Sequence, residues 1–347
     1  MVKRLLCGIL VISLVFSFAG CKKNTDTLSV DRGEDTAVSV PEKPKYAVNN
    51  LTGLEDLSPE KANRRPVAVT INNISIAQPV QTGIGKADIV YETEVEGGIT
   101  RLVAIFKDTT GIEKIGTVRS ARYAFIDLAM GHDAIYVHHG QDSYHAGRHL
   151  NDVDRLVVSK NDGGARISNG LSSEHTLYGY GDGMWQSMVS KGFETTTTKT
   201  ENWQNFVTET VKFENVANKV TVPFSASYKT EMVYDATSGK YIRYFNGTER
   251  KDYYTKENLA FKNVFVLNTT IRSYPGCTDG KGHKEVLLNS GDGYYIVNGT
   301  YTPIKWSKGS ASNSFKFTNV DGTALDVAAG NSWVCISDMN RSKPVFA

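Results

Sequence analysis

Three glutamates at alternate positions, Glu92, Glu94 and Glu96, are the first residues in this chain whose spacing suggests chemistry. They precede a Gly97-Gly98 pair, and Arg101 follows it. Alternate residues of a strand face the same side at steps of roughly 7 Å, and a Gly-Gly pair is typical of a two-residue hairpin turn. With that turn, Glu94 lies opposite Arg101. The pattern predicts a line of carboxylates on one hairpin face, with a guanidinium against it.

The other face of this hairpin is predicted to be the core face. Because side chains alternate, Ile89, Tyr91, Thr93 and Val95 are expected to share it with Leu102, Ala104 and Phe106. On the polar face, three like charges repel each other, so Arg101 and a further cation are needed to offset them. The alternative is a solvated outer face with one surface ion pair, worth at most about 1 kcal/mol.

A second polar group follows at the expected ends of two more strands. Residues 114–118 and 134–138 are predicted strands, and a helix from Ser120 to Met130 is expected between them. If the strands are parallel, their carboxyl ends and the helix N-terminus share one sheet edge, where backbone N–H groups favour anions. The residues gathered there are Arg119, Ser120, Arg122, His138 and His139. The alternative is that both arginines are solvated or pair with the glutamates as structure.

Two later residues, Arg166 and His175, lie in the loop-like stretch ARISNGLSSEHTLYG and complete the candidate set. His145 and His149 have the i, i+4 spacing that can bind a metal on a helix, but no Glu follows His145, so no metal is predicted. No Gly-x-Ser-x-Gly elbow, phosphate loop or dinucleotide fingerprint occurs. The sequence therefore predicts no cofactor and does not specify a reaction.

The N-terminus has the composition of an export signal. Lys3 and Arg4 precede an apolar run that ends in Phe18-Ala19-Gly20-Cys21. The run is too short to span a bilayer, and a cysteine after Ala-Gly is typical of a lipobox, so residues 1–20 are predicted to be removed and Cys21 to be acylated, for example with palmitate. This predicts a chain anchored by lipid to the extracytoplasmic face of the cell membrane. The alternative is an ordinary secretory signal with an incidental cysteine.

Charge balance argues against nucleic acid as a partner. Loss of Lys3 and Arg4 from the 39 basic residues leaves as many basic residues as the 37 acidic ones. A basic footprint for phosphate backbones is therefore absent.

Composition along the chain predicts the domain organisation. Residues 21–63 are polar and weakly periodic, as expected of a flexible tether. Residues 64–200 mix strand and helix patterns, whereas residues 213–347 consist of short alternating strands separated by turns. We expect an N-terminal α+β domain followed by a β-rich C-terminal domain.

Several blocks together resemble a known family. The stretches RRPVAVTINN, KADIVYETEVEGGITRLVAIF, GTVRSARYAFIDLA and DAIYVHHG, and later YIRYFNG and VDGTALDVAAGNSWVCI, are similar to the YerB-type lipoproteins, whose domains have no known function. The resemblance covers residues 64–338. It implies an α+β fold with mixed sheets and a helical layer, a three-layer ββα-type sandwich, in an envelope lipoprotein. The chain departs from the family at Glu174-His175-Thr176, where members more often have Pro-His-Asn.

Three functions remain open at this point. The first is binding of an anionic or sugar-containing envelope ligand, such as a cell-wall fragment, because arginines suit bidentate contacts to phosphate or carboxylate. The second is a hydrolase or transferase acting on envelope material, with a glutamate or histidine as general base. Neighbouring glutamates on one strand face point the same way and cannot flank a scissile bond, which disfavours a two-carboxylate glycosidase. The third is a protein-binding scaffold whose polar cluster is structural.

Overall fold

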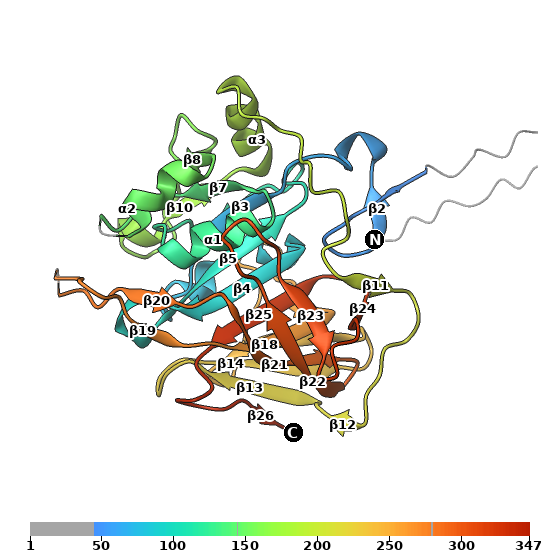
Figure 1. Ribbon diagram of the computed structural model, residues 1–347. Coiled ribbons are helices and arrows are strands. Elements are labelled where there is room, and N and C mark those ends of the chain that lie inside the picture. Colours follow the sequence, from blue (N-terminus) through green and yellow to red (C-terminus); the bar gives the residue numbers. More distant parts are fainter. Residues whose placement is uncertain (1–44, 144, 279) are drawn as a thin grey trace, which may run out of the picture. The chain divides into compact units, whose positions relative to one another are not determined.

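The computed structural model describes residues 45–143, 145–278 and 280–347 (Figure 1). The predicted signal peptide and Cys21 lie outside the described residues. Residues 45–347 form one compact unit. The tether prediction was wrong for residues 45–63, because this stretch carries β1 (Ala47–Val48) and β2 (Glu55–Leu57) and buries Leu51 in the core.

An 11-stranded mixed sheet contains strands from both predicted domains. The strand order is β12-β22-β21-β18-β25-β4-β5-β3-β7-β8, with β23 paired to β22. β25 of the C-terminal part runs parallel to β4 of the N-terminal part and joins the two halves. The strands are β3 (Val67–Asn72), β4 (Ile89–Glu94), β5 (Thr100–Phe106), β7 (Ile135–His138), β8 (Arg155–Val157), β12 (Asn215–Val216), β18 (Asn263–Asn268), β21 (Ser290–Val297), β22 (Thr300–Ser307), β23 (Lys316–Asn319) and β25 (Ser332–Ser337).

The remaining strands form smaller sheets among the described residues. A six-stranded antiparallel sheet consists of β13 (Lys219–Pro223), β14 (Lys229–Asp235), β15 (Lys240–Phe245), β16 (Thr248–Glu249), β17 (Ala260–Phe261) and β26 (Val345–Phe346). A three-stranded sheet consists of β6 (Ile115–Gly116), β10 (Leu177–Gly179) and β9 (Gly164–Arg166). Besides β1-β2, the paired strands are β11 (Asn205–Val207) with β24 (Asp326–Ala328) and β19 (Ile271–Ser273) with β20 (Lys284–Val286).

The central strands of the large sheet, β25, β4, β5, β3 and β7, are buried on both faces. One face packs against α1 (Tyr123–Gly131), through Phe125 and Leu128 of that helix. The other packs against the six-stranded sheet and α3 (Gly181–Ser190), and α2 (Ala146–His149) is a single turn that contacts α1. The broad expectation of a strand-rich α+β fold is confirmed, whereas the three-layer ββα description stays a prediction.

The predicted β–helix–β unit is not formed by β6 and β7, because β7 has a different parallel neighbour. β7 was correctly predicted, but β6 lies in another sheet and pairs with β10, so β6 and β7 are not parallel neighbours. β7 instead runs parallel to β3. The N–H of Arg119 donates to the Thr70 carbonyl on β3 (2.9 Å), and the His139 N–H donates to the Arg119 carbonyl (3.0 Å). Arg119 therefore still lies at the carboxyl ends of two parallel strands.

Candidate functional site

The hairpin register differs by one residue from the predicted one. The turn contains three residues, Glu96-Gly97-Gly98, and the Val95 N–H donates to the Ile99 carbonyl (2.8 Å). Both glycines have positive φ, +68° and +69°, which explains the Gly-Gly pair. Glu94 consequently lies opposite Thr100, and Arg101 opposite Thr93.

The predicted Glu94–Arg101 pair is therefore wrong. A shift of one residue moves a side chain to the other face of the sheet, so Arg101 projects from the face opposite to that of Glu94. Glu94 is buried and pairs instead with Arg341 (2.5 Å) and Lys284 (3.2 Å). The predicted core face is corrected in the same way, since Tyr91 pairs with Val103 rather than sharing a face with Leu102.

Glu92 is a buried structural residue with no exposed surface. Its carboxylate accepts hydrogen bonds from Thr100 (2.8 Å), Thr230 (2.8 Å) and the Trp333 indole (3.1 Å). It also accepts one from Asn73 (3.0 Å), and the Arg243 guanidinium, likewise fully buried, lies 3.8 Å away. Glu92 is thus enclosed by partners from both halves of the chain.

Sequence reasoning missed Arg243, although a signal was present. Along β15 the buried positions alternate, and Arg243 lies between the buried Tyr241 and Phe245 on the inward face. Its guanidinium also stacks over Trp333, with 4.9 Å from Cζ to the ring centroid. A cation at an inward-facing strand position requires a buried partner, and Glu92 is that partner.

Three of the predicted arginines lie close together, and we call Arg101, Arg119 and Arg122 the arginine cluster. Arg122 donates two hydrogen bonds to Glu96, at 2.5 and 3.0 Å, and His283 also contacts that carboxylate (2.5 Å). Burial alone would raise the pKa of Glu96, but hydrogen bonding and charge from Arg122 outweigh it and hold the pKa at about 2. Glu96 is therefore a firmly ionised partner of Arg122.

Arg119 has its own carboxylate. It forms an ion pair with Glu174 (2.5 Å), from the turn that also holds His175. His175 is buried, and its Nδ1 accepts from the Asn72 side chain (2.8 Å), which leaves the proton on Nε2 facing Glu174 at 3.6 Å. Burial lowers the pKa of His175. Glu174 thus holds the guanidinium of Arg119, and His175 lies behind Glu174.

Arg101 differs from the other two arginines. It is 5% exposed, and its guanidinium donates to the Ser120 carbonyl (2.9 Å). It forms no ion pair with any carboxylate in the described part of the chain. Burial, then the positive charge of Arg122, lower the pKa of Arg101 to about 9, with Glu96 opposing and Arg119 adding to the effect. The cluster thus contains one buried cation that forms no direct ion pair with a carboxylate of the described residues.

His139 and Arg166 form a separate pair nearby. His139 donates from Nδ1 to the Val158 carbonyl (2.8 Å), so its Nε2 can accept from Arg166 (3.3 Å), which also contacts the Ser173 carbonyl. His138, by contrast, is 1% exposed, donates to the Gly140 carbonyl (2.8 Å) and stacks on Tyr136. Burial lowers the pKa of His138. The structure therefore places His139 at the edge and His138 in the core.

The hollow beside the glutamates is too small for a ligand. Its volume is about 10 Å³, and Glu94, Glu96, Arg122 and Lys284 line it. A water molecule alone needs a comparable volume. The predicted line of carboxylates is therefore a set of internal ion pairs.

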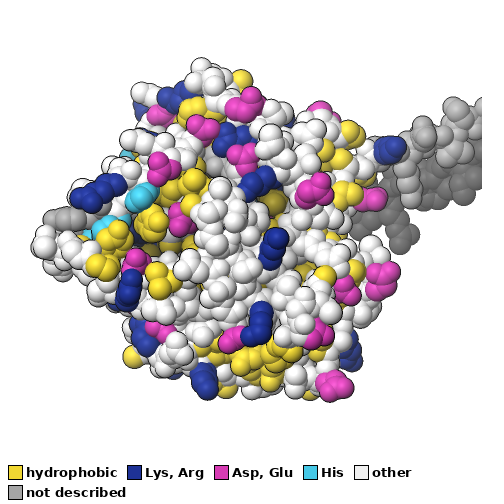
Figure 2. Space-filling view, in the orientation of Figure 1, with side chains coloured by type: hydrophobic (Ala, Val, Ile, Leu, Met, Phe, Trp, Pro, Cys, Tyr) yellow, Lys and Arg dark blue, Asp and Glu magenta, His cyan; other side chains and the backbone are white. Residues whose placement is uncertain are grey.

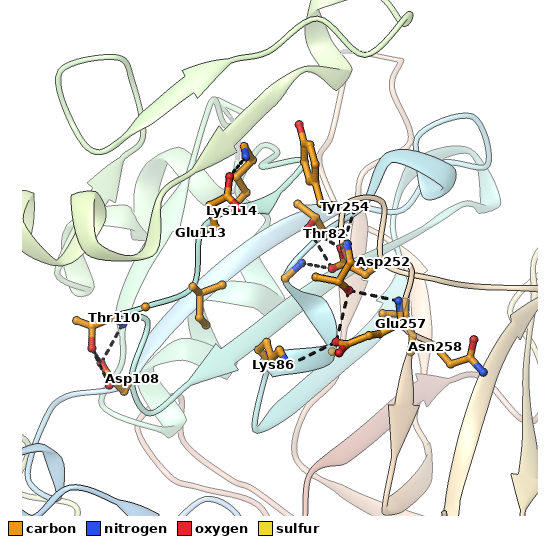
Figure 3. Close-up of a pocket in the computed structure, with 16 residues that line it drawn as sticks. Thr82, Lys86, Asp108, Thr110, Glu113, Lys114, Asp252, Tyr254, Glu257 and Asn258 are labelled. Carbon is orange, nitrogen blue, oxygen red and sulfur yellow. Dashed lines mark hydrogen bonds and ion pairs between the residues drawn. The ribbon is translucent and has the colours of Figure 1, made fainter. Parts of the chain in front are cut away.

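A larger cavity of about 470 Å³ lies where the two halves meet (Figure 3). Asp252 accepts from the Thr82 hydroxyl (2.9 Å) and the Gly83 N–H (2.6 Å), and so ties the second half to the first. At the rim, Lys86 pairs with Glu257 (3.5 Å), and Lys114 lies 4.2 Å from the centroid of the Tyr254 ring. Most charged groups in its lining already have partners, and several of these contacts connect the two halves of the chain.

Neither a metal centre nor a membrane-spanning helix is found in the described residues. No group of three or more His, Cys, Asp or Glu side chains there is arranged to hold a metal ion. None of the helices in residues 45–347 has the length and apolar composition needed to cross a membrane.

Comparison with known proteins identifies the family. Residues 51–194 match the model described as the N-terminal domain of a protein of unknown function (DUF3048), and residues 220–334 match that of its C-terminal domain. The chain belongs to this YerB-like family. The family resemblance seen in the sequence is thereby confirmed.

Comparison with the YerB sequence and with a YerB crystal structure shows how far the similarity extends. The Bacillus subtilis (strain 168) protein named "Putative lipoprotein YerB" is 31% identical over 311 residues, which cover 86% of this chain and 88% of that protein. A crystal structure of the YerB protein from Bacillus subtilis superposes with a TM-score of 0.73 at 28% identity, covering 87% of this chain and 99% of that one. The two YerB-like domains match separate segments, and Glu92 and Arg243 join one to the other.

Proposed function

We propose that this protein is an envelope lipoprotein, anchored through Cys21 on the extracytoplasmic face of the membrane, that binds an anionic or sugar-containing envelope ligand at the arginine cluster. The lipoprotein name of the Bacillus subtilis relative and the lipobox-like Phe18-Ala19-Gly20-Cys21 support the anchor. The arginine cluster supports the ligand chemistry.

The observation that carries the binding proposal is that Arg101 is buried and forms no ion pair with a carboxylate of the described residues. A buried cation without a counterion is costly, and its neighbours Arg122 and Arg119 add repulsion. A phosphate or carboxylate group placed between the three guanidinium groups would remove that repulsion and form charge-assisted hydrogen bonds. The side chains of Arg119 and Arg122 are 27% and 19% exposed, so a ligand can approach them from solvent.

Neighbouring polar groups suit a ligand that also carries hydroxyls. Ser120 is partly exposed, and the Arg166–His139 pair lies beside Arg119 at the same end of β7. Catalysis is not part of the proposal, because a general base must reach its substrate. Glu92 and His138 are 0% and 1% exposed, and Glu94 and Glu96 already hold cations.

The test is binding of the full chain, in mild detergent, to isolated cell wall before and after acid extraction of its phosphate polymers. Arg101→Met is expected to weaken binding by about tenfold or more, because it removes charge-assisted hydrogen bonds. It should lower the free energy of unfolding little, because it also removes a buried charge that is repelled by Arg122 and Arg119. The matched control is Arg272→Met, an exposed arginine paired with Glu285 on the β19–β20 hairpin. Unchanged binding by Arg101→Met would contradict the proposal and favour a scaffold.

A further inference from the structure

A cleft of about 1080 Å³ opens between the connection that follows Thr197 and the β22–β23 connection. Its lining includes Trp203, Asn289, Lys308 and Asn313. Thr198, Lys199 and Ser312 also line a neighbouring hollow of about 320 Å³, so the cleft continues past Lys199. Figure 2 shows uncharged polar side chains and backbone, in white, over the β22–β23 connection, with dark blue Lys or Arg side chains beside them.

The walls of the cleft are held in place by backbone carbonyls. The Gly131 carbonyl, at the end of α1, accepts from Lys199 Nζ (2.9 Å) and from the Ser314 hydroxyl (2.5 Å). Lys308 Nζ donates to the carbonyls of Ser310 (3.1 Å) and Ala311. A Cβ at Gly131 would lie 2.9 Å from the Asn313 carbonyl, so this close approach requires glycine. The cleft is therefore pre-organised before any ligand arrives.

The polar side chains that line the cleft are mostly uncommitted. Asn202, Asn289, Asn313 and Lys316 are exposed, and none of their side chains forms a hydrogen bond or ion pair with another described residue. Trp203, 7% exposed, lines the same cleft, and its indole N–H has no acceptor among the described residues. Three amides, an ammonium group and an indole thus retain hydrogen-bonding capacity.

The charge of the cleft is positive. Lys199, Lys308 and Lys316 line it, against Glu201 as the one acid in its lining. Burial lowers the pKa of Lys308 to about 8, with Asp127 opposing and Lys199 adding to the effect, so Lys308 stays mostly protonated at pH 7. Burial and the charges of Lys199 and Lys308 also lower the pKa of His132, packed behind Trp203, to about 3. The lysines therefore supply the positive charge of this region.

We propose that this cleft binds an oligosaccharide whose sugars carry acidic groups. Side-chain amides both donate and accept, and so match the closely spaced hydroxyls of sugars, while the lysines match carboxylates. A peptide is usually held by a sheet edge or by apolar pockets for its side chains. This cleft offers few such pockets, because its aromatic residues Trp203 and Phe315 are 7% and 2% exposed.

The proposal is tested with two tetrasaccharides, tetragalacturonate and the neutral chitotetraose. Isothermal titration calorimetry on the full chain in detergent at low salt should give at least about tenfold tighter binding of the acidic tetramer, since each 1.4 kcal/mol is tenfold. Asn313→Ala combined with Lys316→Ala should weaken that binding by about tenfold or more. Trp203 fluorescence should respond to the acidic tetramer in the wild type.

Two control variants make the result interpretable. Lys305→Ala removes an exposed lysine on β22, the strand that pairs with β23, where Lys316 lies. Lys305 does not line the cleft, so this variant should bind as the wild type does. Arg272→Met removes an exposed arginine that pairs with Glu285 and also lies outside the cleft lining, so it should bind tetragalacturonate as the wild type does. Absence of binding, binding that the Asn313/Lys316 variant leaves intact, or equal binding of both tetramers would overturn the proposal.

Discussion

The arginine cluster and the cleft are polar regions of opposite construction. Around the arginine cluster, Glu96 holds Arg122 and Glu174 holds Arg119, and Arg101 alone is left without a carboxylate among the described residues. In the cleft, by contrast, Asn313 and Lys316 have no described side-chain partner. Most charged groups around the arginine cluster are thus already paired within the protein.

This contrast affects how polar residues in a sequence are interpreted. Charged side chains that are dense along one short stretch must find counterions on folding, because buried unpaired charge is costly. The glutamates of β4 and its turn did so, each with a cation distant in sequence. Exposed amides face no such cost and can remain available to a ligand. Functional capacity in this fold therefore depends on which groups stay unpaired.

The largest effect on stability is expected at Glu92, which tests most directly whether the glutamates of this region are structural. Glu92→Gln leaves the Arg243 charge buried without its carboxylate and should lower the free energy of unfolding by about 3–5 kcal/mol. Urea denaturation at pH 7 measures this. If Glu92 were instead a binding or catalytic residue, the variant would keep its stability and lose only function.

A double-mutant cycle separates the pair from its surroundings. Glu92→Gln with Arg243→Met should cost less than the sum of the single changes, because the second change removes the stranded charge. The matched control is Asp292→Asn, whose pair with Lys305 is mostly exposed and should be worth less than about 1 kcal/mol. Additive losses at Glu92 and Arg243 would argue against a coupled pair.

The sequence allowed a good part of the fold to be predicted, but not its register. Strand β7 and the strand-rich C-terminal part follow from alternation and turn residues, which are local signals. The register of the hairpin differs by one residue from the predicted one because Glu96 is part of the turn, where Arg122 and His283 hold its carboxylate. These partners are far from Glu96 in the sequence, so local reasoning could not include them.

The candidate site was predicted in part for the same reason. Arg101, Arg119, Ser120 and Arg122 do come together, because the carboxyl ends of β3 and β7 meet at one edge. Arg243 could have been found from its inward-facing position on β15. The cleft could not, because Asn202, Asn289 and Asn313 lie in three separate connections and carry no pattern.

A smaller and pH-dependent effect is expected at Glu96. Glu96→Gln should lower the free energy of unfolding at pH 7 by about 1.5–3 kcal/mol, the range for hydrogen bonds to charged groups. The pKa of Glu96 is about 2 in the folded protein, below its ordinary value of 4.5, so this contribution is fully present above pH 4.5. It is lost as the pH falls from 4.5 towards 2, and the difference between variant and wild type should shrink over that window. Urea titrations at pH 7, 4.5 and 3 measure it, and a difference that stays constant would argue against an ionised Glu96.

The smallest effect is expected in the cleft. Asn313→Ala and Lys316→Ala should each change the free energy of unfolding by less than about 0.5 kcal/mol, as is usual for exposed side chains without partners. Ser314→Ala, two residues before Lys316, is the matched contrast, because its hydroxyl donates to the Gly131 carbonyl and should cost about 0.5–1.5 kcal/mol. Thermal and urea unfolding of the three variants compare them. If Asn313→Ala or Lys316→Ala lowered the free energy of unfolding as much as Ser314→Ala does, these polar groups would stabilise the fold. The cleft would then not differ in this respect from the arginine cluster.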